Sequence, residues 1–146
     1  MFYGEFAHSL DQKGRLIIPS KLREVAKDRL IDRFFVTRGL DRCLFMFTEE
    51  EWRLQESKLR NLPFTKGEFR KFNRLFFSGA SDCQCDPQGR ILIPPYLQEH
   101  AQLKKNVVLV GVSNRIEIWS KELWKEFCDS NQDSYEDFAE RLMSEN

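Results

Sequence analysis

The chain has 146 residues, of which 41% are hydrophobic and 32% are charged, and this composition supports a buried core and argues against disorder. Its 23 basic and 23 acidic residues cancel, so the net charge gives no support to nucleic-acid binding, and any such function depends on where the charges lie. No apolar run approaches the roughly 18 residues of a membrane span, and the N-terminus lacks the apolar stretch of a signal peptide, which predicts a cytoplasmic protein with no membrane partner.

The charges are divided unevenly along the chain. Residues 1–75 carry 16 basic and 11 acidic residues, whereas residues 76–146 carry 7 basic and 12 acidic residues. The acidic residues are concentrated after Trp119, where residues 121–146 hold three basic and eight acidic residues. We expect this tail to face water or a basic neighbour rather than phosphate.

The first predicted unit begins with an alternating strand that reaches the turn Asp11-Gln-Lys-Gly-Arg15. Aspartate suits the first position of such a turn, and glycine supplies the positive φ that closes a tight hairpin. The residues LIIP (16–19) follow as a short buried strand. A helix of about two turns starts near Ser20, with Leu22, Val25 and Ala26 on one face. Two more strands flank a turn at residues 39–42.

Helices are predicted next. Thr48 and Glu51 have the spacing of a capping box, which predicts a helix through about Leu59. Phe69, Phe72 and Phe76 then recur at helical spacing. We interpret this apolar stripe as a core or subunit contact.

The second unit repeats the first. Residues 77–101 align without gaps onto residues 2–26, and residues 108–124 align onto residues 36–52 after a change of three residues in length. Ser120 then predicts the start of a helix with Leu123, Trp124 and Phe127 facing inward. A last helix follows, carrying at helical spacing Tyr135, Phe138, Leu142 and Met143.

A unit present twice indicates two half-structures that bury a common face as a pseudo-dimer. The predicted fold class is α+β, with two β-β-α-β-β repeats and additional helices. The predicted divisions are a first repeat at 5–48, a helical connector at 49–76, a second repeat at 77–120 and an acidic helical segment at 121–146.

The two hairpin turns are the candidate binding elements, because a hairpin tip can enter a groove as wide as the DNA major groove. The candidate DNA-contacting residues are Lys13, Arg15, Lys21, Arg23 and Arg90, and those that would shape the turns are Asp11, Gly14, Asp86 and Gly89. An alternative stays open: an Asp and an Arg four residues apart across a turn often pair with each other and only stabilise the hairpin.

The chain resembles the MraZ family of bacterial transcription regulators, which are built from two tandem SpoVT-AbrB modules. The resemblance is carried by MFYGEFAHSLDQKGRLIIPSKLRE, by SDCQCDPQGRILIPPYLQEHA and by VVLVGVSNRIEIW, and it covers essentially the whole chain. It implies an intramolecular swapped-hairpin, double-split β-α-β barrel. It also implies a ring-shaped homo-oligomer, associated with the nucleoid, that binds double-stranded DNA at direct repeats in the promoter of the division and cell-wall gene cluster and represses it.

By the same resemblance, DNA binding falls on Asp11 and Arg15 and on Asp86 and Arg90. The second loop, DPQGR, has no counterpart of Lys13, so we expect it to bind phosphate less strongly. A rival interpretation is an antitoxin-like or scaffold protein that uses the same barrel to bind another protein.

Other chemistry finds little support in the sequence. Four cysteines without a signal peptide predict reduced thiols, and Cys83 and Cys85 have no second metal-binding arm. The two histidines, His8 and His100, belong to no catalytic motif. We therefore expect no enzyme activity, no metal, no cofactor and no small-molecule substrate.

Overall fold

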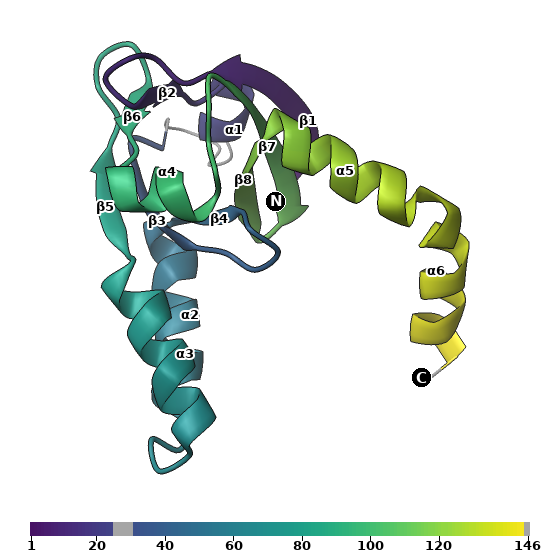
Figure 1. Ribbon diagram of the computed structural model, residues 1–146. Helices are drawn as coiled ribbons and strands as arrows, with labels where there is room; N and C mark the ends of the chain where they lie inside the picture. The colour runs from purple at the N-terminus through teal and green to yellow at the C-terminus, as the bar shows by residue number, and fades with distance from the viewer. Residues whose placement is uncertain (25–30, 145–146) are drawn as a thin grey trace.

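The computed structural model describes residues 1–24 and 31–144. Each half of the chain has the predicted order β-β-α-β-β (Figure 1). In the first half the elements are β1 (Phe2–Ser9), β2 (Arg15–Ile17), α1 (Ser20–Arg23), β3 (Arg33–Arg38) and β4 (Leu44–Thr48). In the second half they are β5 (Ser81–Gln84), β6 (Arg90–Leu92), α4 (Pro95–His100), β7 (Asn106–Ser113) and β8 (Arg115–Ser120).

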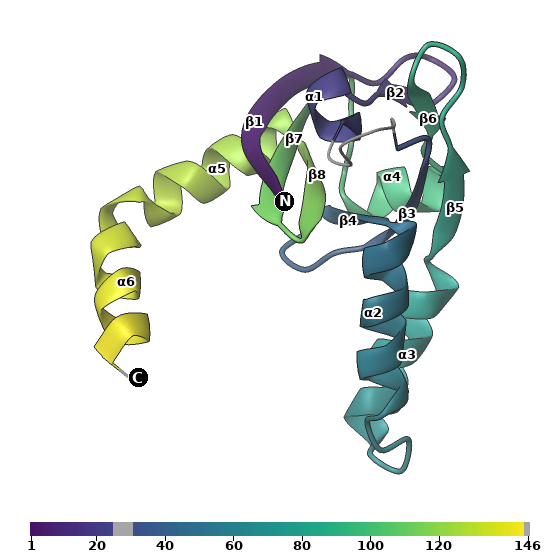
Figure 2. The ribbon, with the colours of Figure 1, turned by 180° about the vertical axis from the view of Figure 1, so that it is seen from behind.

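The remaining helices form two arms. α2 (Glu49–Arg60) and α3 (Gly67–Ser78) make a helical hairpin between the repeats, and α5 (Lys121–Asn131) continues through a 3-10 turn (Gln132–Ser134) into α6 (Tyr135–Ser144). The predicted N-caps are confirmed, because Thr48 Oγ1 accepts a hydrogen bond from Glu51 N at 3.2 Å and Ser120 Oγ accepts one from Leu123 N at 3.1 Å. Figures 1 and 2 show the two arms well apart from each other.

The strands of the two repeats are interleaved. Six antiparallel strands form one sheet in the order β1-β7-β8-β4-β3-β5, and β2 pairs with β6 in a separate two-stranded ribbon. The first strand of each repeat therefore pairs with the third strand of the other, β1 with β7 and β5 with β3. The duplication predicts that the two repeats associate with each other, and strand pairing between the repeats joins them in this way. The closed barrel stays a prediction, because β1 and β5 lie at the two ends of the strand order.

The core lies between these strands and the short helices, and it draws on matched positions of both repeats. Ile18 and Ile93 are fully buried, and Leu22 and Leu97 are buried on α1 and α4. The predicted continuation of the first helix through Val25 and Ala26 lies outside the described residues.

One expectation about the core was wrong. The segments LIIP and ILIP are not buried throughout, since Ile17 is 44% exposed and Leu92 is 58% exposed. Successive side chains of a strand point to opposite faces, so only Leu16 and Ile18, with their counterparts in the second repeat, point into the core. The outer face of the β2–β6 ribbon is therefore exposed.

Candidate nucleic-acid interface

The first hairpin turn is held together by one aspartate. Asp11 Oδ1 accepts hydrogen bonds from Lys13 N at 2.9 Å and Arg15 N at 2.8 Å, and Asp11 Oδ2 accepts one from Arg15 Nε at 2.7 Å. The backbone closes the turn through Gly14 N to Asp11 O at 3.0 Å, with Gly14 at φ +82°. These bonds, led by the one from the Arg15 amide, lower the pKa of the Asp11 carboxyl, which is therefore ionised at neutral pH.

The second hairpin repeats this arrangement. Asp86 Oδ1 accepts from Gln88 N at 3.0 Å and Arg90 N at 2.9 Å, and Asp86 Oδ2 accepts from Arg90 Nε at 2.7 Å. Gly89 has φ +78°, and the pKa of Asp86 is lowered chiefly by the backbone hydrogen bond from Arg90. The repeated D-x-x-G-R sequence thus gives two turns of one design.

The pairing of Asp with Arg, which the sequence left open as a purely structural role, is present in both turns. This ion pair uses the Nε edge of each guanidinium. Within the described chain, the side-chain hydrogen bonds of Arg15 use Nε alone, and its Nη1 and Nη2 donors make no such bond. The Arg15 side chain is 32% exposed and that of Arg90 is 26% exposed. The aspartate can therefore orient the arginine while leaving its outer donors for an acceptor such as phosphate or guanine.

The two turns emerge at one end of the molecule. Antiparallel pairing of β2 with β6 places Arg15 opposite Leu92 and Ile17 opposite Arg90. Figures 1 and 2 show both loops projecting side by side beyond the sheet. The ribbon thus presents two arginine-bearing turns, one from each repeat, on a shared support.

Each turn is also covered by the other repeat. Ile18 N donates to Gly89 O at 2.9 Å, and Ile93 N donates to Gly14 O at 2.8 Å. A Cβ on Gly14 would lie 2.6 Å from Nε2 of Gln98, and a Cβ on Gly89 would lie 2.8 Å from Cζ of Arg23. The two covering side chains occupy equivalent positions of the repeats, so neither turn has its native surroundings without the other half of the chain.

The four cysteines are free thiols, and three of them are buried or partly buried in the core. Cys43 and Cys83 are buried, and burial raises the pKa of both thiols; it raises the pKa of the partly buried Cys85 to about 11. Among the described residues there is no group of three or more His, Cys, Asp or Glu side chains that could hold a metal ion. Within 1–24 and 31–144, no helix has the length and apolar character needed to cross a bilayer.

Comparison with known proteins gives the family. A family model described as "MraZ protein, putative antitoxin-like" matches residues 1–75 and again residues 76–146. The chain belongs to the MraZ family. The two matches divide the chain at the same place as the internal duplication, so each repeat is one family unit.

Similar members of the MraZ family cover nearly the whole chain. Relatives from Carboxydothermus hydrogenoformans and Moorella thermoacetica are 50% and 51% identical over 143 residues, which is 98% of this chain and 97% of each relative. A relative from Desulfitobacterium hafniense is 52% identical over 144 residues, 99% of this chain and 98% of its own. All three carry the name "Transcriptional regulator MraZ".

The predicted MraZ-family site residues are only partly brought together. Lys13 is exposed in the first turn, beside Arg15. Lys21 is exposed on α1, outside the ribbon. Arg23 donates from Nε to Ile18 O at 3.1 Å, and its guanidinium lies beside Gly89 of the second turn.

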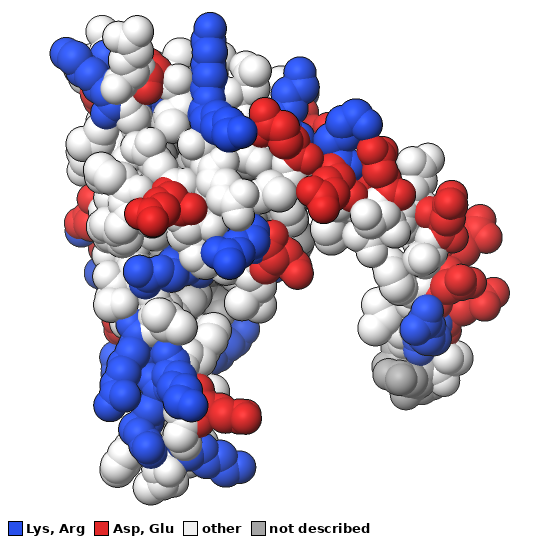
Figure 3. Space-filling view, in the orientation of Figure 1, with Lys and Arg blue, Asp and Glu red and all other residues white. Residues whose placement is uncertain are grey.

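Two lysines beside the first turn were missed. Lys104 and Lys105 line a groove of about 600 Å³ together with Asp11, Gln12 and Gln98. Leu10 N also donates to Lys105 O at 2.8 Å. These lysines come from the second repeat, more than 85 residues away in sequence, and no local pattern joins them to the first turn. Figure 3 shows basic side chains over this end of the molecule.

Proposed function

We propose that the chain is a sequence-specific DNA-binding transcriptional regulator. Its membership of the MraZ family and the name of its relatives support regulation of transcription. The observation that carries the DNA contact is the β2–β6 ribbon, which presents two aspartate-supported arginine turns at one end of the molecule.

The ribbon has the shape and donors for this task. The major groove is about 12 Å wide and admits a two-stranded β-ribbon. An arginine held at Nε keeps Nη donors in a fixed plane, which suits the O6 and N7 acceptors of guanine or two phosphate oxygens. In this proposal Arg15 donates hydrogen bonds to a base edge or to phosphate oxygens. Lys13, Lys104 and Lys105 contact phosphate.

Self-assembly belongs to the proposal, because a single chain has no net charge to draw it to DNA. Several copies with their ribbons on one face of a ring would bind direct repeats, each further contact forming at high effective concentration. The proposed target is the promoter of the division and cell-wall gene cluster, which the bound ring would repress on the nucleoid. The interleaved hairpins would close as the swapped-hairpin barrel, with Asp11, Arg15, Asp86 and Arg90 as its DNA-facing motif.

The test is Arg15→Ala in a gel-shift assay on duplexes that carry the repeated promoter boxes. We expect a loss of about 10- to 100-fold in affinity, the range for a base-contacting arginine. Arg53→Ala is the matched control, because Arg53 also makes an i,i+4 ion pair, with Glu49 at 2.9 Å, but lies on α2. Unchanged affinity of Arg15→Ala, with the oligomer intact, would refute the proposed contact.

The antitoxin-like or scaffold function is the second candidate, favoured by the wording of the family description. The same preparation distinguishes the two. A DNA-binding regulator releases counterions from phosphate, so its affinity falls steeply as salt rises. Weak retention on DNA that does not depend on salt would favour the protein-binding alternative.

A further inference from the structure

Two helical arms lie away from the proposed DNA contact. Figures 1 and 2 show the tip of the α2–α3 hairpin and the end of α6 far from the β2–β6 ribbon, and far from each other. A duplex held by the ribbon would therefore leave both arms free for another contact.

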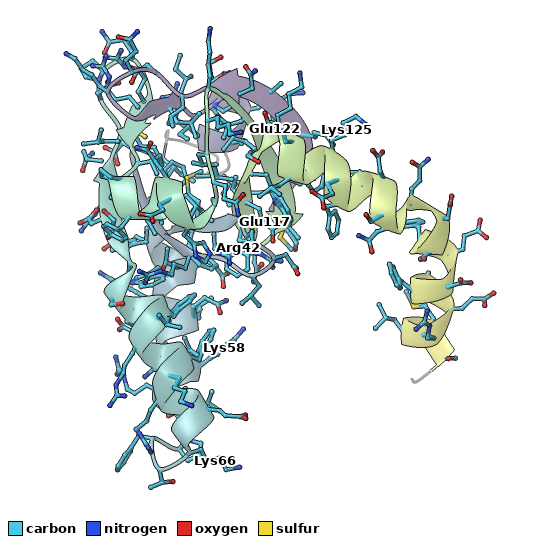
Figure 4. All side chains as sticks on the ribbon, viewed as in Figure 1. Arg42, Lys58, Lys66, Glu117, Glu122 and Lys125 are labelled. Atoms are coloured by element: carbon cyan, nitrogen blue, oxygen red, sulfur yellow. The ribbon has the colours of Figure 1, made fainter. Side chains whose placement is uncertain are left out.

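The outer half of the α2–α3 hairpin is basic and incompletely buried. Residues 58–74 contain six basic residues and one acidic residue. Figure 3 shows these cations gathered on the hairpin, and Figure 4 places Lys58 and Lys66 on its outer half. Only the root of α3 reaches the core, where Phe76 stacks on Trp52 with ring centroids 5.5 Å apart.

The tip of this hairpin exposes apolar side chains in an ordered loop. Phe64 is 75% exposed, and Leu62 is 47% exposed. Arg70 Nη1 donates to the carbonyl oxygens of Phe64 and Thr65 at 3.0 Å each, which holds the loop against α3. The predicted apolar stripe of α3 is therefore core only at its root, and the rest forms an apolar patch within a basic rim.

The C-terminal arm is acidic, and several of its apolar side chains are exposed. Residues 121–144 contain seven acidic and three basic residues. No residue of α6 is buried, although Phe138, Leu142 and Met143 recur on it at helical spacing. An apolar groove of about 400 Å³ at the elbow is lined by Phe127 and Tyr135 among others. A ten-residue helix gains little stability from its own sequence, so packing against a partner surface would stabilise α6.

We propose that the basic outer half of the α2–α3 hairpin of one chain packs against the acidic α5–α6 arm of a second copy. The apolar patches would form the centre of the contact and the opposite charges its rim, which is the usual anatomy of a protein interface. The two arms of one chain lie apart, so the hairpin that meets an arm belongs to a neighbour. Such a contact is heterologous, and it closes as a ring or continues as a filament.

This inference rests on the self-assembly part of the proposed function and names its surfaces. Its test uses two full-length variants with reversed charges. Lys71→Glu/Arg74→Glu changes the net charge of α3 from +2 to −2, and Glu136→Lys/Glu140→Lys changes that of α6 from −2 to +2; all four side chains are exposed. Masses are measured by light scattering after gel filtration at low salt. Each variant alone should have an assembly dissociation constant at least about tenfold higher, because two attractive pairs become repulsive.

Mixing the two variants in equal amounts should restore the assembly, because both kinds of contact between them then join opposite charges. Lys104→Glu/Lys105→Glu is the control for the first variant, since it makes the same change in net charge away from both arms, and it should keep the wild-type mass. Wild-type mass for either variant alone, or no recovery on mixing, overturns the interface. These readings need no DNA, so a failure of Arg15→Ala to weaken DNA binding would refute the DNA contact and leave the interface standing.

Discussion

The turns at 11–15 and 86–90 are closed by the same five hydrogen bonds, whose lengths differ between the turns by at most 0.2 Å. They differ in what surrounds those bonds. The first turn carries Lys13, whereas the second carries Gln88, whose Oε1 accepts from Arg90 Nη2 at 3.4 Å. The first arginine therefore keeps more of its donors free.

The comparison separates two roles within one motif. The aspartate, the glycine and the arginine Nε build the turn in both repeats, whatever the other residues are. The lysine and the outer arginine donors vary between the repeats, and they set how much positive charge each turn offers. The following predictions test this division, starting with the largest expected effect.

Gly14→Ala should lower the free energy of unfolding by about 1–2 kcal/mol, because alanine is strained at positive φ. The added Cβ would also lie 2.6 Å from Gln98 Nε2, so the covering side chain must move. Urea denaturation followed by circular dichroism measures the change. Gly67→Ala is the control, because its nearest contact would be an ordinary 3.7 Å. Equal stability of the two variants would show that the turn does not depend on glycine.

Arg90→Ala should weaken binding to the repeated boxes by no more than about fivefold, on the order of 1 kcal/mol, and so by less than Arg15→Ala. The reason is that Arg90 is less exposed and shares a donor with Gln88. The same gel-shift titration compares both variants. Equal losses of DNA affinity in the two variants would show that both turns contribute equally to binding.

Removing the lysine from the first turn, or adding one to the second, should change the salt dependence of DNA binding. Lys13→Gln makes the first turn similar to the second, and it should reduce the slope of log affinity against log salt by about one. Gln88→Lys should increase the slope by a similar amount. Fluorescence anisotropy at several salt concentrations measures both. If neither variant changes the slope, the lysine position does not contact phosphate.

The smallest effect concerns pH. The pKa values of Asp11 and Asp86 are lowered in the folded chain, so ionisation of these carboxyls stabilises the fold above the unfolded pKa of about 3.9. This contribution is lost as the pH falls through the lower folded pKa. Asp11→Asn and Asp86→Asn should therefore each lower Tm at pH 7, and the difference from wild type should shrink as the pH falls below about 4.

Thermal melts between pH 7 and pH 3 give this comparison. Glu68→Gln, on the exposed surface of α3, serves as the control for the loss of one negative charge. A Tm difference that stays constant down to pH 3 would show that the carboxylate charge does not hold the turns. Unequal effects of the two Asn variants would contradict the shared structural role of the aspartates.

Local chemistry made part of this structure predictable. The D-x-x-G-R turns and the caps at Thr48 and Ser120 follow from side chains that bind backbone groups a few residues away. The duplication also predicted the two β-β-α-β-β units. In each case the interacting groups are close together in sequence or are repeated in it.

Contacts between the repeats could not be read in this way. Pairing of β1 with β7, the cover that Gln98 gives to Gly14, and the placement of Lys104 beside Asp11 join residues that are distant in sequence. The apolar residues of α6 illustrate a second limit, because helical spacing identifies an apolar face without showing what covers it. DNA contact by Lys13, Arg15, Lys21, Arg23 and Arg90 stays a prediction.

The pairing of β1 with β7 also affects how the chain folds during its synthesis. Phe2 lies opposite Ser113. β1 is therefore synthesised first and stays unpaired until most of the chain, including β7, has been made. During that interval its hydrogen-bonding edge is open to a strand of any neighbouring nascent chain. Crowded translation of one messenger would therefore favour exchange of halves between chains, and the rate of elongation would influence how many chains mature correctly.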